Sequence, residues 1–195
     1  MEREAQEEFY QEEGNTFLVL GAYQVHKFKP KIDLEKVLKL INVYKKTGFK
    51  VSKVNPWHSD TFLQEKSEWN FFKEEIYRVF KLFGKDDVIL DNLWSTYQAK
   101  GEYTGIHNHI LGGIGNNKRV PDWTFCYYPQ DIVETGGLIF HLENQPSACI
   151  TEYPKAGDLY IFRSNIWHST QPYFGNDFRF CISGNLRERY GTYKG

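Results

Sequence analysis

The chain has 195 residues, of which 41% are hydrophobic and 17% aromatic, and its formal net charge is −1. A chain of this length and composition can bury a sizeable core, which predicts a single domain spanning residues 1–195. No basic stripe stands out, so the sequence lacks the electrostatic footprint of a nucleic-acid-binding protein. We therefore expect no nucleic-acid partner.

The cysteines and the N-terminus indicate the compartment. Cys126, Cys149 and Cys181 are odd in number and lie in or beside apolar runs, which is typical of reduced thiols rather than of a disulfide framework. No apolar stretch approaches the length of a membrane span, and residues 1–13 carry six glutamates where a signal peptide would be basic. The sequence predicts a cytoplasmic protein with no membrane partner.

Residues 1–87 predict a strand followed by supporting helices. The apolar run 16–20 begins a strand that can extend to Phe28, and Asp33 is a suitable N-cap for a helix that ends near Gly48. A second helix is expected over 67–83, with an aromatic stripe along one face. We interpret this stripe as packing against a sheet and not as a cofactor site.

Beyond Lys85 the pattern changes to short β-rich runs separated by turn residues, which is typical of a sandwich or barrel. The expected strands lie near 88–98, 104–111, 123–129, 137–143, 148–153, 158–163, 168–173 and 178–185. Eight short strands of this kind predict a mainly β fold, a double-sheet jelly roll with N-terminal helices, whose core spans residues 88–187.

Three histidines and one arginine in this core point to a metal site. His107 and His109 stand at i and i+2, so on a strand their side chains would share one face, about 6.5–7 Å apart at the backbone. His168 on a neighbouring strand would complete a face of three ligands. This is the layout of a non-haem iron site that keeps positions open for reaction, and Arg179 would pair with an anionic cosubstrate.

The core resembles the 2-oxoglutarate and Fe(II)-dependent oxygenase superfamily. The resemblance covers residues 88–187 and is closest to the small oxygenases of bacteria and tailed phages that carry a His-x-His motif. The matching stretches are Leu93-Trp94 through Tyr97, Lys100-Gly-Glu-Tyr103, His107-Asn-His109, Phe125-Cys-Tyr-Tyr128, Gly136-Gly-Leu-Ile-Phe140, Gly157-Asp-Leu-Tyr-Ile-Phe162, Trp167-His168 and Arg179-Phe-Cys-Ile-Ser-Gly-Asn185.

This resemblance implies a double-stranded β-helix of the cupin-like kind with helices packed on one sheet. It implies Fe(II) and 2-oxoglutarate as cofactors and O2 as a partner. The activity would be a dioxygenase reaction that hydroxylates a small-molecule or peptide substrate and releases succinate and CO2. Neither the substrate nor the oligomeric state can be inferred from the sequence.

The resemblance also assigns residues to roles. His107, His109 and His168 would hold the metal, and Arg179 would bind the remote carboxylate of 2-oxoglutarate, because arginine stays charged and grips a carboxylate with two prongs. Ser183 and Tyr97 would assist at that carboxylate. Tyr127 is a weaker candidate from the facing strand.

One departure from the family pattern keeps alternatives open. Most members have Asp or Glu where this chain has His109, so the site would carry one more positive charge. A three-histidine iron dioxygenase that acts directly on a small thiol without 2-oxoglutarate is one alternative, and a non-catalytic metal-binding jelly roll is another. Asp122 is an alternative third ligand. We interpret His26, His58 and His141 as surface or structural residues.

Overall fold

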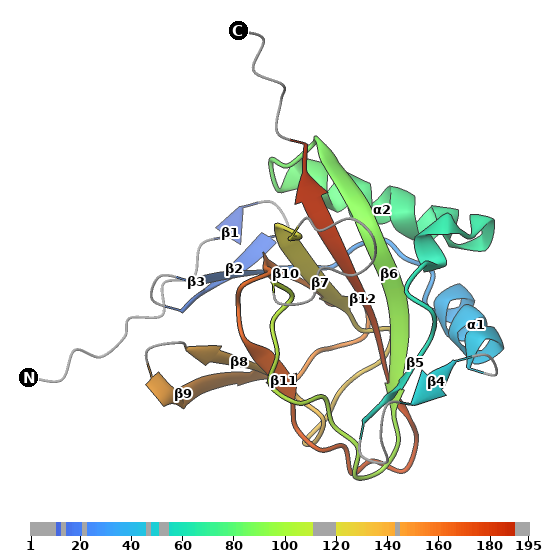
Figure 1. Ribbon diagram of the computed structural model, residues 1–195, viewed down its shortest axis with the longest axis vertical. Coiled ribbons are helices and arrows are strands. Elements are labelled where there is room, and N and C mark those ends of the chain that lie inside the picture. The colour runs from blue at the N-terminus through green and yellow to red at the C-terminus, as the bar shows by residue number, and fades with distance from the viewer. Residues whose placement is uncertain are drawn as a thin grey trace, which may run out of the picture.

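The computed structural model describes residues 11–12, 15–20, 23–45, 48–50, 55–110, 120–142 and 145–189. Most of the six N-terminal glutamates lie in residues 1–10, outside the described residues. Two antiparallel sheets dominate the described part (Figure 1). None of the described helices is long and apolar enough to cross a membrane.

The larger sheet has nine strands in the order β1-β2-β3-β10-β7-β12-β6-β5-β4. Their bounds are β1 (Gln11–Glu12), β2 (Asn15–Leu20), β3 (Tyr23–Phe28), β4 (Phe49–Lys50), β5 (Trp57–His58), β6 (Val88–Gln98), β7 (Trp123–Tyr127), β10 (Leu159–Arg163) and β12 (Arg179–Glu188). The smaller sheet has the order β11-β8-β9. Its strands are β8 (Leu138–Leu142), β9 (Gln145–Glu152) and β11 (His168–Thr170).

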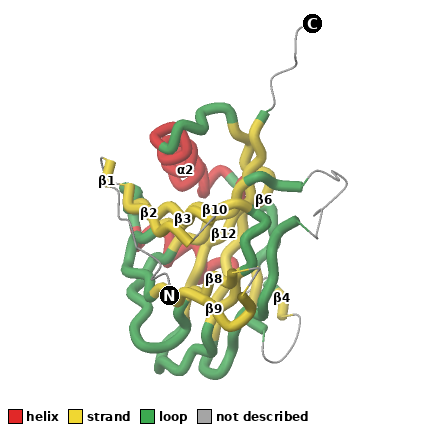
Figure 2. The backbone as a smooth tube through the Cα atoms, turned by 90° about the vertical axis from the view of Figure 1, so that its left-hand side faces the viewer, coloured by secondary structure: helices red, strands yellow, loops and turns green. Residues whose placement is uncertain are grey.

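The two described α-helices lie on the side of the large sheet away from the small one (Figures 1 and 2). Helix α1 (Leu34–Tyr44) begins where the side chain of Asp33 accepts a hydrogen bond from the Lys36 amide at 3.0 Å, as the sequence predicts. The predicted helix 67–83 begins as a short 3-10 turn, and helix α2 proper spans Asn70–Leu82. The buried residues of α2 lie on the face for which the sequence predicts the aromatic stripe.

The large sheet is buried on both faces, which gives the protein two cores. Its outer face packs against the helices, and this core includes Phe72, Phe125 and Ile182. Its inner face packs toward the small sheet, and this core includes Cys126 and Cys181. Strand β7 is therefore buried at every position, and successive residues of β7 and β12 belong to alternate cores. The pocket lined by His107, His109, His168 and Arg179 lies on this inner side, where Cys126 and Cys181 also line it.

Two predicted strands are not single regular strands in the structure, and others differ in where they begin or end. The run 16–28 is a hairpin of β2 and β3 rather than one strand, with Leu20 paired to Tyr23. The run 104–111 is not a regular strand in its described part, because only His107 forms an isolated bridge, to His168. Strand β9 begins earlier than the predicted 148–153, and β11 ends earlier than the predicted 168–173.

Truncation of Phe72 to alanine is expected to reduce the free energy of unfolding by about 3–5 kcal/mol. The Phe72 ring is fully buried and meets Tyr127 at 5.3 Å and Trp69 at 5.7 Å between ring centroids, so its removal leaves a cavity. Leu82→Ala is the matched control, since Leu82 is 65% exposed on the same helix and should change stability by less than about 0.5 kcal/mol. Urea denaturation measures both.

Metal affinity per folded molecule should be unchanged in Phe72→Ala, because α2 lies on the face of the sheet opposite the pocket. A Phe72→Ala protein of normal stability that had lost metal binding would show that α2 contributes to the site and not only to the scaffold.

Candidate metal centre

The segment 104–110 carries two of the three predicted ligands and docks against the strand that carries the third. His107 and His168 exchange two backbone hydrogen bonds of 3.0 and 2.9 Å, and the His109 amide donates to the Ser164 carbonyl at 2.9 Å. These bonds hold the segment antiparallel to residues 164–170. The backbone thus brings residues about sixty positions apart in the sequence to one place.

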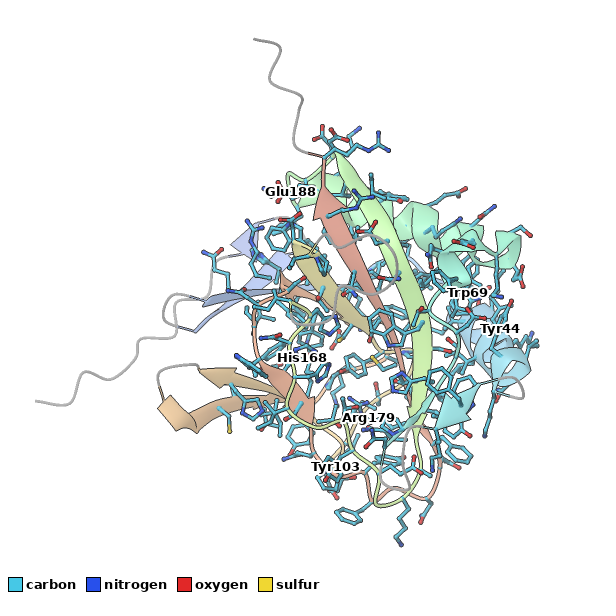
Figure 3. All side chains as sticks on the ribbon, viewed as in Figure 1. Tyr44, Trp69, Tyr103, His168, Arg179 and Glu188 are labelled. Carbon is cyan, nitrogen blue, oxygen red and sulfur yellow. The ribbon has the colours of Figure 1, made fainter. Side chains whose placement is uncertain are left out.

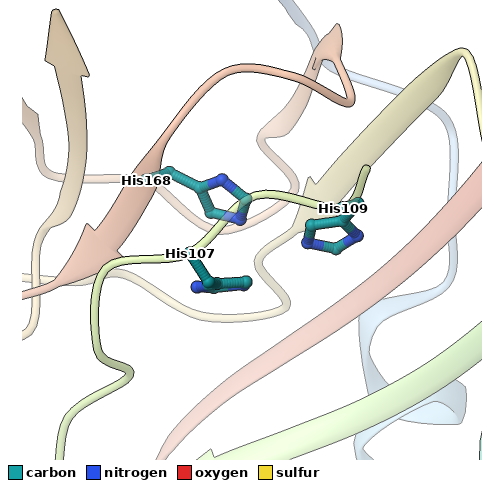
Figure 4. Close-up of side chains that lie close together, drawn as sticks. All are labelled: His107, His109 and His168. Atoms are coloured by element: carbon teal, nitrogen blue, oxygen red, sulfur yellow. The ribbon is translucent and has the colours of Figure 1, made fainter. Parts of the chain in front are cut away.

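The three imidazoles of His107, His109 and His168 form one cluster (Figure 4). One ligand nitrogen from each lies within 4.8 Å of the others. The ring centroids are between 4.3 and 5.2 Å apart. Within the described part of the chain, this is the one group of three or more His, Cys, Asp or Glu side chains close enough together to hold a metal ion.

Each imidazole of the triad places its Nδ1 against an oxygen acceptor. The pairs are His107 with the Gly105 carbonyl (2.9 Å), His109 with the Asn185 side-chain oxygen (2.6 Å) and His168 with the Ile166 carbonyl (3.0 Å). An acceptor at Nδ1 keeps the proton there and leaves the Nε2 lone pair for a metal. Nε2 of His109 is buried and has no hydrogen-bond partner among the described residues. The donor set therefore fits a divalent transition metal such as iron or nickel.

Burial keeps the triad neutral, which metal binding requires. It lowers the pKa of His109 to about 4, with the charge of His107 acting in the same direction and the hydrogen bond to Asn185 opposing it. Burial is also the main cause that lowers the pKa of His107 and of His168. All three imidazoles are thus in the neutral form at neutral pH, with one ring nitrogen free of a proton.

Arg179 is a buried cation beside the triad pocket (Figure 3). Only 2% of the residue is exposed. Its Nε donates to the Gly136 carbonyl at 2.6 Å and its Nη2 to the Tyr128 hydroxyl at 3.1 Å. In the described part of the chain no carboxylate forms an ion pair with it. A buried guanidinium without an anion is costly, so this position calls for an anionic ligand.

Gly136 is required where the arginine passes. Its φ is +75°, and a Cβ there would lie 2.9 Å from Cδ of Arg179 and 2.9 Å from the Tyr173 ring. Any side chain would therefore strain the backbone and push Arg179 out of place. This explains the first glycine of the Gly136-Gly-Leu-Ile-Phe140 stretch.

The triad and Arg179 line one pocket between the two sheets, which encloses about 490 Å³ when the space open to solvent at its mouth is counted. Ser183, a predicted site residue, also lines it, and its hydroxyl lies 3.5 Å from the Cys181 sulfur and 3.7 Å from the Cys126 sulfur. Burial would raise the pKa of Cys181, but its hydrogen bond with Cys126 and the charge of Arg179 outweigh this and lower it to about 7.

Tyr97 does not lie in this pocket, contrary to the prediction. It stands on β6 between Thr96 and Gln98, and Thr96 takes the pocket face. Because side chains alternate along a strand, the Tyr97 ring projects from the other face. There it stacks on Trp57 at 5.1 Å and meets Phe178 at 4.9 Å. Tyr97 is therefore not among the described residues that line the pocket with Arg179.

Tyr127, a predicted site residue, does not line the pocket either, whereas its neighbour Tyr128 does. Tyr127 packs on the outer face of β7 against Phe72, whereas Tyr128 lines the pocket and accepts the hydrogen bond from Arg179. The pairing of Cys126 with Ser183 fixes this arrangement, since Tyr128 follows Cys126 by two residues.

Asp122 does not join the triad. Its carboxylate accepts a hydrogen bond from the Glu188 amide at 2.8 Å, at the far end of β12. The structure thus leaves His109 as the third member of the cluster. His26 is a core residue against Phe83, and His141 hydrogen-bonds the Ser169 hydroxyl on the small sheet.

The site contains further residues that the sequence did not single out. Asn185 is 2% exposed, holds Nδ1 of His109 and also accepts a hydrogen bond from the Thr124 hydroxyl. The Trp94 ring stacks on His109 with centroids 5.8 Å apart. His58, expected to be structural, lines the pocket. Asn185 is the last residue of the stretch Arg179-Phe-Cys-Ile-Ser-Gly-Asn185, so the family resemblance could have identified it.

No described protein family and no curated protein matches the sequence. Solved structures do match the fold. HygX from Streptomyces hygroscopicus, with nickel and 2-oxoglutarate bound, aligns with a TM-score of 0.66 at 9% identity, over 86% of this chain and 84% of that one. The viral collagen prolyl hydroxylase vCPH from Paramecium Bursaria Chlorella virus-1, in its 2OG complex, aligns at 0.61 and 14% identity, over 87% and 98%. SnoN, a non-haem α-ketoglutarate-dependent epimerase from nogalamycin biosynthesis, aligns at 0.65 and 11%, over 84% and 78%.

These similarities show a shared fold. The protein is a double-stranded β-helix with helices packed on one sheet, as predicted. The aligned proteins use 2-oxoglutarate, by their descriptions, for reactions that include epimerisation as well as hydroxylation. The fold therefore does not select a reaction, and the function must be argued from the site itself.

Proposed function

We propose that this protein is a 2-oxoglutarate- and Fe(II)-dependent oxygenase, in which His107, His109 and His168 hold the iron and Arg179 binds the remote carboxylate of 2-oxoglutarate. The observation that carries the proposal is the pairing of two features in one pocket. Each of three imidazoles places one ring nitrogen within 4.8 Å of the others, and a buried guanidinium beside them has no carboxylate partner among the described residues.

The chain's own residues bind and orient the cosubstrate. Arg179 is held by Gly136 and Tyr128, so its charge is fixed in place before the dianion arrives. The hydroxyls of Tyr128 and Ser183 line the same pocket and can bond a carboxylate oxygen. Trp94 covers one side of His109 and limits the access of water to the ligand. These contacts fix the geometry of the bound groups before reaction.

Bound iron with 2-oxoglutarate and O2 would supply the oxidising chemistry, which converts 2-oxoglutarate to succinate and CO2 and hydroxylates a C–H bond of the substrate. The solved structures with this fold support the cofactor assignment, because HygX holds nickel and 2-oxoglutarate, and SnoN is described with Fe³⁺ and α-ketoglutarate. The reaction type and a kinship with the oxygenases of bacteria and tailed phages are parts of the proposal.

The proposal predicts O2 consumption that depends on both Fe(II) and 2-oxoglutarate, with succinate formed in step. In the absence of the substrate, O2 consumption should be slow but measurable. It should cease when succinate replaces 2-oxoglutarate. An oxygen electrode together with succinate analysis measures both quantities. Iron-dependent O2 use that ignored 2-oxoglutarate would instead support a three-histidine dioxygenase, and the absence of iron-dependent O2 use would support a metal-binding module.

A further inference from the structure

Among the described residues, the lining of the pocket includes no acidic side chain to offset its positive charges. Its ionisable lining consists of four histidines, Arg179, two cysteines and Tyr128, and none of the described residues that line it is Asp or Glu. Glu102 is buried and is close to His107 in the sequence, but its carboxylate forms an ion pair with Lys50. The described part of the chain therefore supplies no carboxylate as a counter-charge at the wall of the pocket.

This inference rests on the proposed function, and it begins from the charge of the loaded site. The two charges of Fe(II) and the one of Arg179 exceed the two of the 2-oxoglutarate dianion by one positive charge, because His107, His109 and His168 are neutral ligands. A carboxylate in the ligand set would cancel this excess. Here the excess remains in a pocket enclosed by two sheets, where an uncompensated charge is unfavourable.

Cys181 does not remove the excess in the loaded state. Its thiol lies two residues from Arg179 on the same strand face, and the charge of the guanidinium is one cause of its lowered pKa. A carboxylate of 2-oxoglutarate bound to Arg179 would neutralise that charge and add a negative one beside the sulfur. Both effects favour the neutral thiol when the cosubstrate is bound.

His58 marks where a further group can be bound. Strand β5 pairs with the edge of β6 so that His58 lies opposite Thr96, and both side chains face the pocket. The His58 ring is half-buried and stacks on Phe49 with centroids 6.0 Å apart. Among the residues that the structure describes, no hydrogen bond to this ring is found, so its nitrogens are available to a ligand.

We propose that the substrate of this site is a small organic acid, whose carboxylate or phosphate group enters the pocket beside His58. The anionic group would offset the positive charge that the three-histidine ligand set leaves on the loaded site, and His58 would donate a hydrogen bond to it. The excess positive charge favours an anionic substrate, and His58 provides the position at which its anionic group binds.

The test begins with the oxygen-free Fe(II) protein titrated with 2-oxoglutarate, followed by the metal-to-ligand charge-transfer absorption. The Co(II) protein saturated with 2-oxoglutarate is then titrated with azide, a small anion, followed by the cobalt absorption bands. Wild type should bind azide at least about tenfold more tightly than His109→Asp, which restores one negative charge to the ligand set. His109→Glu serves in its place if His109→Asp does not retain cobalt.

Asn108→Asp is the matched control for charge. Asn108 adjoins His109 and adds the same unit charge on mutation, but its side-chain oxygen accepts a hydrogen bond from the Ile110 amide outside the triad. Its azide affinity should stay within about threefold of wild type, since a solvated charge is screened. Equal azide affinity in wild type and in the cobalt-loaded carboxylate variant would overturn the charge argument.

The role of His58 is tested with acetate and acetamide, which have the same shape but differ in charge. The wild-type cobalt protein loaded with 2-oxoglutarate should bind acetate at least about tenfold more tightly than acetamide, as followed by the cobalt absorption bands. His58→Phe should reduce this preference to less than about threefold. An equal response of wild type to both, or an unchanged preference in His58→Phe, would overturn the assignment. Failure of the initial 2-oxoglutarate titration would overturn the proposed function and, with it, the charge count used here.

Discussion

Replacement of Arg179 by alanine is expected to weaken 2-oxoglutarate binding by about 2–5 kcal/mol and to leave metal affinity within about threefold of wild type. The guanidinium is fully buried and its hydrogen bonds go to Gly136 and Tyr128, so its loss leaves the cosubstrate carboxylate without a charged partner. Arg179→Lys should recover only part of the affinity, because an ammonium cannot form the two-pronged contact. The measurement is the anaerobic 2-oxoglutarate titration of the Fe(II) protein.

Arg163→Ala is the matched control for this experiment. Arg163 is a strand arginine at the surface, where it stacks on Trp123 at 3.9 Å and lies 3.5 Å from a Glu188 carboxylate oxygen. Its loss should not change 2-oxoglutarate affinity. Tyr128→Phe should weaken binding, whereas Tyr127→Phe should not, because only Tyr128 meets Arg179. Wild-type affinity in Arg179→Ala would refute the role given to this arginine, and a wild type that binds no 2-oxoglutarate would refute the cofactor assignment.

The strand pattern of the sequence was sufficient for the fold and for the residues with distinctive chemistry. His107, His109, His168 and Arg179 have side chains rarely found together inside a β-sandwich, so their spacing and the family resemblance pointed to one site. The structure brings all four to one pocket.

The tyrosines could not be placed in the same way. Aromatic residues fill both faces of this sheet, because helices cover one face and the small sheet covers the other. Which of Tyr127 and Tyr128 faces the pocket depends on the pairing of Cys126 with Ser183. The face on which Tyr97 lies depends in the same way on the pairing of Thr96 with Cys181. A shift by one residue exchanges the two faces, and the sequence alone does not fix that register.

The segment 104–110 and His58 show a second limit. Backbone hydrogen bonds to residues 164–170 hold the segment without making it a regular strand, so its position depends on contacts about sixty residues away. His58 reaches the pocket through the two-residue strand β5 at the edge of the large sheet. Pairing at such long range leaves no local periodicity to detect.

His109→Ala is expected to lower Fe(II) affinity by more than about 100-fold, since changes in residues that merely orient a ligand already cost about 10–100-fold. Asn185→Ala tests that orienting role and should fall in the 10–100-fold range, because Asn185 holds Nδ1 of His109 at 2.6 Å. Asp122→Asn is the control that decides between the two candidate third ligands. It should bind iron as wild type does, because its carboxylate is engaged by the Glu188 amide. Competition with a chromophoric chelator under anaerobic conditions measures all three affinities, with circular dichroism to verify folding. Full iron affinity in His109→Ala, or loss of affinity in Asp122→Asn, would contradict the three-histidine centre and transfer the third position to a carboxylate.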